Sequence, residues 1–287
     1  MKMENSEFSN EIVYHYCGIN AFINIVQHSK IWLSDVFKSN DSQELLWAME
    51  NVKKEILQMI GDEGTLKSLD MGFNLLNPIE NVGLTSYFIS CFSEEEDLLS
   101  QWCKYAEDGQ GIAIGFSKDL LLKLNSICHG LSFRKVVYSR KEQEIVFKKV
   151  AMENLKKMSS KRAAHVALEL AQNYAEEFLL CKNPSFDEEI EWRIVFTSEA
   201  GRKVNFNECG YKIQNPNIRV SKGNIVAFYE LDFSDIKQDI IKSIVVGPKS
   251  KVTKTDLVKL LFTCGYYDNQ FNTETPINIS FSKSSYR

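Results

Sequence analysis

Short runs in which apolar residues alternate with polar ones, or follow one another without interruption, predict β-strands along most of the chain. The segment from 84 to 93 is the clearest of them in the first half, and the segment from 112 to 116 is apolar enough to be buried on both faces. The predicted strands cover residues 11–17, 30–35, 84–93, 112–116, 131–138, 189–196, 211–213, 225–231, 241–246 and 277–281.

Apolar residues at helical spacing predict helices between these strands. Phe22 and Val26 would face inward on a helix that follows the first strand and a turn at residues 18–20. A later helix would follow the acidic run at residues 94–97, which suits the positive end of a helix dipole. The longest helical pattern extends from residue 141 to about 182.

The order of these elements indicates the fold class. Strands and helices alternate irregularly, and several consecutive strands lack room for the crossover helix that a parallel pair requires. We therefore predict a single α+β domain over residues 1–287, with a mixed, mostly antiparallel sheet flanked by helices. The stretch 141–182 would form a long helical insertion within it.

The most unusual stretch lies at residues 184–196, where four carboxylates occupy the five positions from Asp187 to Glu191. If a strand begins at Glu189, its period of two places Glu189, Glu191 and Arg193 on one face. Ionised side chains are seldom buried without partners. These charges either pair with one another as a structural ion network or line a polar cleft, and the sequence leaves both alternatives open.

Composition and charge narrow the function classes. The 34 Lys and Arg residues against 38 Asp and Glu residues give a formal net charge of −4, so general nucleic-acid binding is not expected. No apolar run is long enough for a membrane span and no signal peptide is evident, so we expect no membrane association and a cytoplasmic protein. The seven cysteines are scattered, and the four histidines show no metal-ligand spacing, so we expect no metal.

Several short motifs resemble a bacterial family known as the domain of unknown function "DUF twenty-nine seventy-one". The most specific is Gln-Trp-Cys-Lys-Tyr-Ala at 101–106, followed by the Gly-x-Gly at 109–111 and an apolar strand. This Gly-x-Gly is interpreted as a tight turn rather than a phosphate loop, because a strand follows it where a phosphate loop would open a helix. The other matching segments are 14–16, 33–35, 39–41, 90–93, 189–193 and 244–248, so the resemblance extends over nearly the whole chain. The family has no established activity.

A weaker resemblance implies a chemistry. ADP-ribosyltransferase-type folds carry a His or Arg on a first strand, a Ser/Thr-rich second strand and a Glu-x-Glu on a later strand, and His15, the segment 90–93 and Glu189-x-Glu191 occur in that order. NAD would be the substrate, and cleavage of its nicotinamide–ribose bond needs a carboxylate near the developing positive charge. By this similarity Glu191 would stabilise the transition state, Glu189 would orient the acceptor, and His15 would contact the ribose. The implied cofactor-binding residues are Tyr14, Tyr16, Ser34, Asn40, Ser90, Ser93 and Arg193.

Two functions therefore stay open. The first is an ADP-ribosyltransferase-like enzyme that modifies an unknown macromolecular acceptor, in a toxin or phage-defence setting by analogy alone. The second is a non-catalytic module that senses a nucleotide-type small molecule or a partner protein. A nuclease is disfavoured by the net charge and by the absence of a recognisable acidic metal cluster. His15 between two tyrosines also has a plainer interpretation, as a core histidine without a catalytic role.

Overall fold

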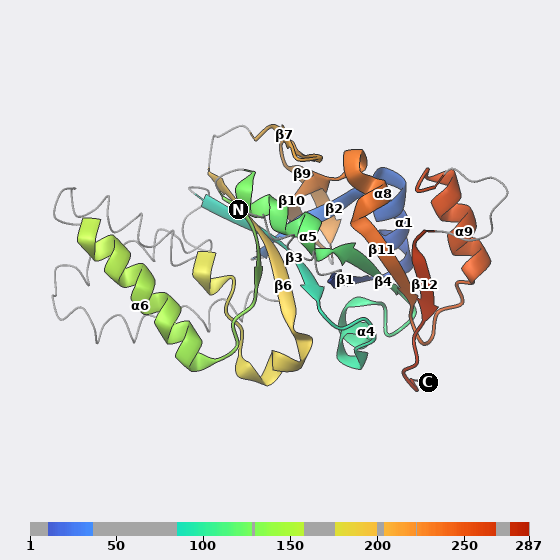
Figure 1. Cartoon of the computed structure of the whole chain (residues 1–287), viewed down its shortest axis with the longest axis horizontal. Helices are drawn as coiled ribbons and strands as arrows, with labels where there is room; N and C mark the ends of the chain where they lie inside the picture. The colour runs from blue at the N-terminus through green and yellow to red at the C-terminus, as the bar shows by residue number, and fades with distance from the viewer. Residues whose placement is uncertain are drawn as a thin grey trace, which may run out of the picture.

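The computed structural model describes residues 11–36, 85–127, 130–157, 176–199, 204–221, 223–267 and 276–286 (Figure 1). Asn40, which the sequence assigns to the site, and the family-like segment 39–41 around it lie outside these residues. Within them the chain forms one mixed sheet with helices around it, which confirms the predicted α+β class. No helix in the described ranges is both long and apolar enough to cross a membrane.

The sheet of the described chain has twelve strands and is mostly antiparallel. The order β12-β11-β4-β1-β3-β2-β10-β8-β7 forms its main path, while β6 pairs with β3 and β5, and β9 pairs with β10. Of the strand pairs described, β11 with β12 is parallel and the others are antiparallel. The strands are β1 Ile12–Cys17, β2 Lys30–Asp35, β3 Thr85–Ser93, β4 Ile112–Ser117, β5 Leu131–Lys135, β6 Glu191–Glu199, β7 Phe206–Glu208, β8 Tyr211–Ile213, β9 Asn217–Ser221, β10 Asn224–Asp232, β11 Ile241–Val246 and β12 Asn278–Phe281.

Short helices surround the sheet, and Figure 1 shows α6 at one end of the molecule and α9 at the other. The α-helices are α1 Ile19–His28, α4 Leu99–Tyr105, α5 Lys118–Leu122, α6 Arg140–Lys157, α8 Lys237–Ile240 and α9 Lys254–Thr263. The 3-10 helices are η2 Lys123–Ser126, η4 Pro184–Glu189 and η5 Ser234–Ile236. Helix α6 lies at the start of the predicted insertion, and residues 158–175 of that insertion lie outside the described ranges.

The structure differs from the sequence prediction at several boundaries, two of them at helices, and in the role of the acidic run. Helix α1 begins at Ile19, directly after Cys17 and Gly18, so residues 19 and 20 are helical rather than part of a turn. The chain is no longer helical from Leu179 onward, because Cys181 pairs with Val137 in a β-bridge. The first turn of α4 contains no acidic residue. Asp97 of the acidic run at 94–97 accepts a hydrogen bond from the Trp102 indole in α4 at 2.7 Å, and it makes a tertiary contact by accepting one from the Lys283 amide at 2.7 Å.

Both faces of the sheet are covered near β1, where side chains alternate between two apolar clusters. Val13 and Cys17 join the larger cluster, which includes the apolar face of α1. Tyr14 and Tyr16 join a smaller cluster around Trp102, whose side chain is fully buried. The period of two along β1 therefore positions the tyrosines in the core rather than at a surface.

The Gly-x-Gly at 109–111 forms a tight turn, as predicted. Gly109 has φ +84°, in the left-handed region that glycine tolerates. The Gly111 carbonyl accepts a hydrogen bond from the Gly247 amide at 3.0 Å, which joins the turn to the end of β11. A Cβ at Gly111 would lie 2.2 Å from the Cys17 carbonyl oxygen, so close backbone packing explains the glycine without any phosphate.

Candidate functional site

The acidic stretch does not continue β6 as predicted, because Glu189 ends the 3-10 helix η4 and β6 begins only at Glu191. Between them Ile190 has φ 38°, in the left-handed region, which breaks the strand period. The prediction that residues 189–196 form one strand is therefore wrong at its start. The side chains of Glu189 and Glu191 nevertheless meet, because both reach the same lysine.

That lysine is Lys182, which lies nine residues before Glu191 and is almost fully buried. Its Nζ donates to Glu189 Oε2 at 2.6 Å and to Glu191 Oε2 at 3.0 Å. Arg193 donates to Glu191 through Nε at 2.7 Å and through Nη2 at 3.1 Å, and to the Leu179 carbonyl through Nη1 at 2.7 Å. We call these four side chains, Lys182, Glu189, Glu191 and Arg193, the ion network.

The ion network is enclosed and its carboxylates are paired. Burial alone would raise the pKa of Glu191, but attraction to Arg193 and Lys182 outweighs it and lowers the pKa to about 2. Burial lowers the pKa of Lys182, and attraction to Glu191 raises it above the usual value. Lys104 donates to the outer oxygen of Glu189 at 2.9 Å. This geometry favours the structural ion network over the polar cleft for this stretch.

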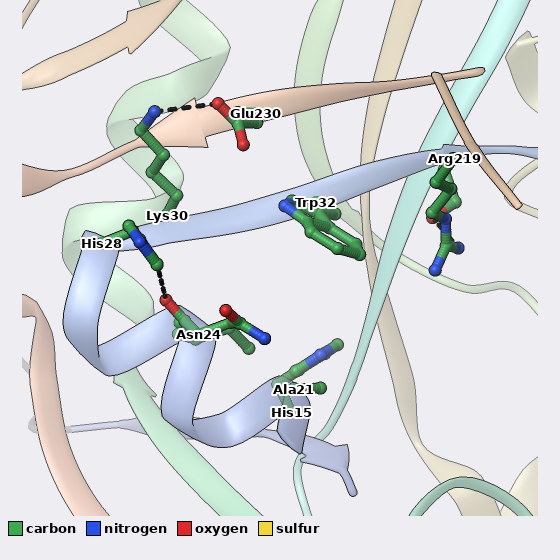
Figure 2. Close-up of a pocket in the computed structure, with 10 residues that line it drawn as sticks. His15, Ala21, Asn24, His28, Lys30, Trp32, Arg219 and Glu230 are labelled. Atoms are coloured by element: carbon green, nitrogen blue, oxygen red, sulfur yellow. Dashed lines mark hydrogen bonds and ion pairs between the residues drawn. The ribbon is translucent and has the colours of Figure 1, made fainter. Parts of the chain in front are cut away.

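A pocket of about 320 Å³ lies elsewhere in the sheet, and we call it the Trp32 pocket (Figure 2). Strand β2 positions Lys30, Trp32 and Ser34 on one face by its alternation, because Ile31 and Leu33 turn into the core. The residues that line the pocket are His15, Ala21, Asn24, Ile25, His28, Lys30, Trp32, Ser34, Arg219 and Glu230. They come from β1, α1, β2, β9 and β10.

Arg219 is the most distinctive group in this pocket. Its guanidinium carbon lies 5.1 Å from the centre of the Trp32 ring and 5.9 Å from that of Phe228. Nη2 donates to Ser34 Oγ at 3.1 Å, while the buried Nε has no hydrogen-bond partner. No carboxylate of the described residues pairs with it, and burial lowers its pKa. A partly buried cation without an anionic partner is a candidate site for an anion.

Trp32 offers the aromatic surface of the same pocket. Its ring lies 4.5 Å from that of Phe228, at an angle of 40°, and 39% of the residue is exposed. In the view of Figure 2 the indole lies between Arg219 and an ion pair of Lys30 with Glu230. That pair joins Lys30 Nζ to Glu230 Oε2 at 2.8 Å. Glu230 is the direct antiparallel partner of Trp32, so the sheet register fixes this arrangement.

His15 brings a neutral imidazole to the pocket. Its Nδ1 lies 2.9 Å from the Cys91 carbonyl oxygen, and since a carbonyl only accepts, Nδ1 carries the proton. Nε2 is then free of a proton and can accept one. Burial lowers the pKa of His15, and the hydrogen bond to Cys91 offsets this only in part.

The structure therefore divides the predicted site residues between several places. His15 and Ser34 line the Trp32 pocket, whereas Glu189, Glu191 and Arg193 form the ion network and do not line it. Ser93 Oγ supports the network by donating to the Glu189 carbonyl at 2.7 Å. The remaining predicted residues, Tyr14, Tyr16 and Ser90, are buried.

The tyrosine hydroxyls are engaged near α4 rather than in the pocket. The Tyr16 hydroxyl donates to the Glu95 carbonyl at 2.8 Å and accepts from the Leu98 amide at 3.0 Å. The Tyr14 hydroxyl donates to Glu96 at 3.3 Å. Burial raises the pKa of both tyrosines, so both stay neutral at ordinary pH.

Sequence reasoning missed Lys182, Trp32, Arg219 and Glu230. Trp32 had a local signal, because the alternation in Lys-Ile-Trp-Leu-Ser-Asp aligns it with Lys30 and Ser34. Arg219 and Glu230 had none, since they reach the pocket only through the pairing of β9 and β2 with β10. Within the described residues no group of three or more His, Cys, Asp or Glu side chains has the arrangement of a metal site.

Comparison with known proteins connects part of the chain to one family. Residues 101–194 match the family model described as "Protein of unknown function (DUF2971)", which confirms the resemblance to that family over this range. Its extension over nearly the whole chain stays a prediction. The matched range contains the whole ion network and none of the residues that line the Trp32 pocket. Searches of curated proteins and of solved structures gave no match.

Proposed function

We propose that this protein binds a nucleotide-type ligand in the Trp32 pocket. The observation that carries the proposal is Arg219, a guanidinium without a carboxylate partner in the described chain, placed against the Trp32 ring. A nucleotide combines a planar base with an anionic phosphate. The base would stack on the exposed part of the indole, and the phosphate would pair with Arg219.

The rest of the pocket fits this class of ligand. Lys30 and Arg219 supply two cations against one carboxylate, Glu230, so the pocket is locally positive although the chain carries a net charge of −4. Asn24 and His15 add polar groups that can reach ribose hydroxyls. A concave site with one aromatic surface and a few polar groups is typical of small-molecule binding.

The test is calorimetric titration of the purified protein with NAD, ADP-ribose and AMP, with adenosine as the ligand that lacks a phosphate. We expect the phosphorylated ligands to bind at least about tenfold more tightly than adenosine, because a charge-assisted contact contributes on the order of 1.5–3 kcal/mol. Arg219→Met should remove this advantage. Arg140→Met, an exposed arginine at the start of α6, is the matched control and should bind as the wild type does.

Two results would count against nucleotide binding. One is the absence of measurable binding by any of the ligands to wild-type protein that is shown to be folded. The other is an unchanged preference for phosphorylated ligands in Arg219→Met.

A second candidate function is cleavage of NAD and transfer of ADP-ribose. In this proposal the catalytic carboxylate is that of Glu230 rather than that of Glu191. His15, Ser34 and Glu230 line one pocket, whereas Glu191 is held by Arg193 and Lys182. In this scheme the bond between nicotinamide and ribose C1′ breaks, nicotinamide leaves as a neutral molecule, and Glu230 stabilises the positive charge on the ribose. Water or a nucleophile on a macromolecular acceptor would then attack C1′ and lose a proton.

Release of nicotinamide from NAD decides between catalysis and binding alone. If the second candidate holds, Glu230→Gln should reduce release by at least about 100-fold, while Glu191→Gln should retain activity in proportion to its folded fraction. If the wild type binds NAD but releases no nicotinamide, the function that remains is that of a non-catalytic sensor module. A toxin or phage-defence role belongs with the catalytic candidate and requires turnover. A cytoplasmic location is a separate prediction that either candidate allows.

A further inference from the structure

The ion pair of Lys30 with Glu230 has hydrogen-bonding capacity that the described chain does not use. Lys30 Nζ donates to Glu230 Oε2 at 2.8 Å, which takes one of the three ammonium donors. Glu230 Oε1 accepts no hydrogen bond from the described residues. The two side chains are 32% and 29% exposed. The pair therefore presents donors beside acceptor oxygens to a ligand in the Trp32 pocket.

The sheet holds this pair beside the indole. Lys30 and Trp32 are two residues apart on β2 and point to the same face, and Glu230 is the direct partner of Trp32 on β10. In the view of Figure 2 the indole lies between the ion pair and Arg219. The proposed function places the phosphate at Arg219 and the base on the indole. The ion pair then lies at the edge of the base that faces away from the phosphate.

The order of donors and acceptors in the pair matches the Watson–Crick edge of guanine. That edge carries one acceptor, O6, followed by two donors, N1–H and the N2 amino group. The Lys30 ammonium would donate to O6, and the two oxygens of Glu230 would accept from N1–H and from the amino group. A carboxylate has about four lone-pair positions, so Oε2 can keep its bond to Lys30.

The other bases match the pair less well. Adenine has one acceptor, N1, and one donor group, the N6 amino group, so it would make two contacts where guanine makes three. Cytosine and uracil, in either direction along the pair, leave one of their acceptors facing a carboxylate oxygen of Glu230. Two acceptors that face each other with no proton between them both lose their bonds to water, which costs affinity.

We propose that the Trp32 pocket selects guanine nucleotides, with Glu230 as the specificity-determining residue. This inference rests on the proposed function and narrows its ligand from nucleotides in general to those with guanine. The pocket volume of about 320 Å³ is at the lower end of the range of ligand pockets, roughly 300–1,000 Å³, so it suits a single nucleotide. Glu230 contacts the base in this mode, and NAD, which carries no guanine, is not the preferred ligand.

The test is calorimetric titration of the wild type with the monophosphates of guanosine, inosine, adenosine and uridine. The four ligands share the ribose and the phosphate and differ in the base. Inosine monophosphate has the O6 and N1–H of guanine without the N2 amino group, so it isolates the contact of that group with the second carboxylate oxygen. We expect guanosine monophosphate to bind at least about tenfold more tightly than the inosine and adenosine ligands, and the uridine ligand to bind most weakly.

Glu230→Gln tests the role of the carboxylate. The amide replaces one acceptor by a donor group, which opposes a donor of guanine, so the preference for the guanosine over the adenosine ligand should fall to less than about threefold. This ratio is the readout because both ligands carry the same phosphate, so a change in the charge of the pocket affects them alike. Glu208→Gln, which changes an exposed acid on β7, is the matched control and should keep the wild-type ratio.

The outcomes separate this inference from the function on which it rests. If none of the four ligands binds to folded wild-type protein, both fail. If the ligands bind without a preference for guanosine monophosphate, or if the preference persists in folded Glu230→Gln, nucleotide binding stands and the guanine inference is overturned. The comparison of the guanosine with the inosine ligand needs no variant, so it decides the matter even if Glu230→Gln does not fold.

Discussion

Lys182 and Glu191 form a buried ion pair, with 3.0 Å between Nζ and Oε2 and about 1% and 5% of the two side chains exposed. The pair connects Lys182, at the end of the helical insertion, to Glu191, the first residue of β6. Arg193 and Glu189 complete the charge balance from the neighbouring positions. The contact therefore fixes how the chain returns to the sheet after the insertion, and it explains two buried acids without a catalytic role.

The first prediction concerns the stability of this network. Glu191→Gln leaves Lys182 and Arg193 buried with one carboxylate too few, and breaking a buried pair in this way costs roughly 3–5 kcal/mol. We expect the free energy of unfolding, measured by urea denaturation, to fall by about that amount. Glu188→Gln, an exposed acid of the same run, should change it by less than about 0.5 kcal/mol. Equal effects of the two substitutions would show that the network does not hold the fold.

The second prediction concerns pH. The pKa of His15 is lowered in the folded protein from its usual 6.5 because its partial burial disfavours the charged imidazole, so the unfolded chain binds a proton first as pH falls. The stability that depends on neutral His15 is present above about pH 6.5 and is lost as pH falls from there toward the lowered pKa. The slope should approach about 1.4 kcal/mol per pH unit within that window.

Urea denaturation of the wild type and His15→Gln between pH 5 and pH 8 measures this slope. The His15→Gln variant should lack the pH-dependent stability that neutral His15 provides. The matched control is His28→Gln, which removes an exposed imidazole from α1. Lys30, Arg219 and Glu230 share the pocket with His15 and are unchanged in both variants. Parallel pH profiles for the wild type and His15→Gln would contradict the prediction.

The third prediction tests the close packing of the Gly-x-Gly turn. A methyl group at Gly111 would lie 2.2 Å from the Cys17 carbonyl oxygen and 3.0 Å from the Ala106 Cα, and both neighbours include backbone that cannot move alone. We expect Gly111→Ala to lower the free energy of unfolding by about 1–3 kcal/mol, the usual cost of overpacking. Gln110→Ala in the same turn is exposed and should be nearly neutral. A thermal unfolding midpoint unchanged by Gly111→Ala would rule out this packing constraint.

Much of the secondary structure could be predicted because it depends on a local property. Strands β1 and β2 match the predicted segments within one residue, and β4 extends its segment only to Ser117. The alternation of apolar and polar residues that marks a strand can be recognised within a few neighbouring residues of the sequence, and it does not depend on which strand lies alongside. The mostly antiparallel sheet followed from the same reasoning, since short connections exclude most crossover helices. His15 and Ser34, which the sequence assigned to one site, do line one pocket, whereas other residues assigned to that site lie elsewhere.

The partners of these elements were decided only by the tertiary structure. Glu189 left the strand because Ile190 adopts a left-handed backbone, and no side-chain period signals such a residue. Lys182 became the partner of Glu191 because the chain returns from the insertion beside β6. The Trp32 pocket formed because β10 pairs with both β2 and β9, which brings Arg219 to residues almost 190 positions away. Strand order and long-range hydrogen bonding depend on the whole chain at once, so the sequence determined the strands and the fold class, and the assembled sheet determined the site.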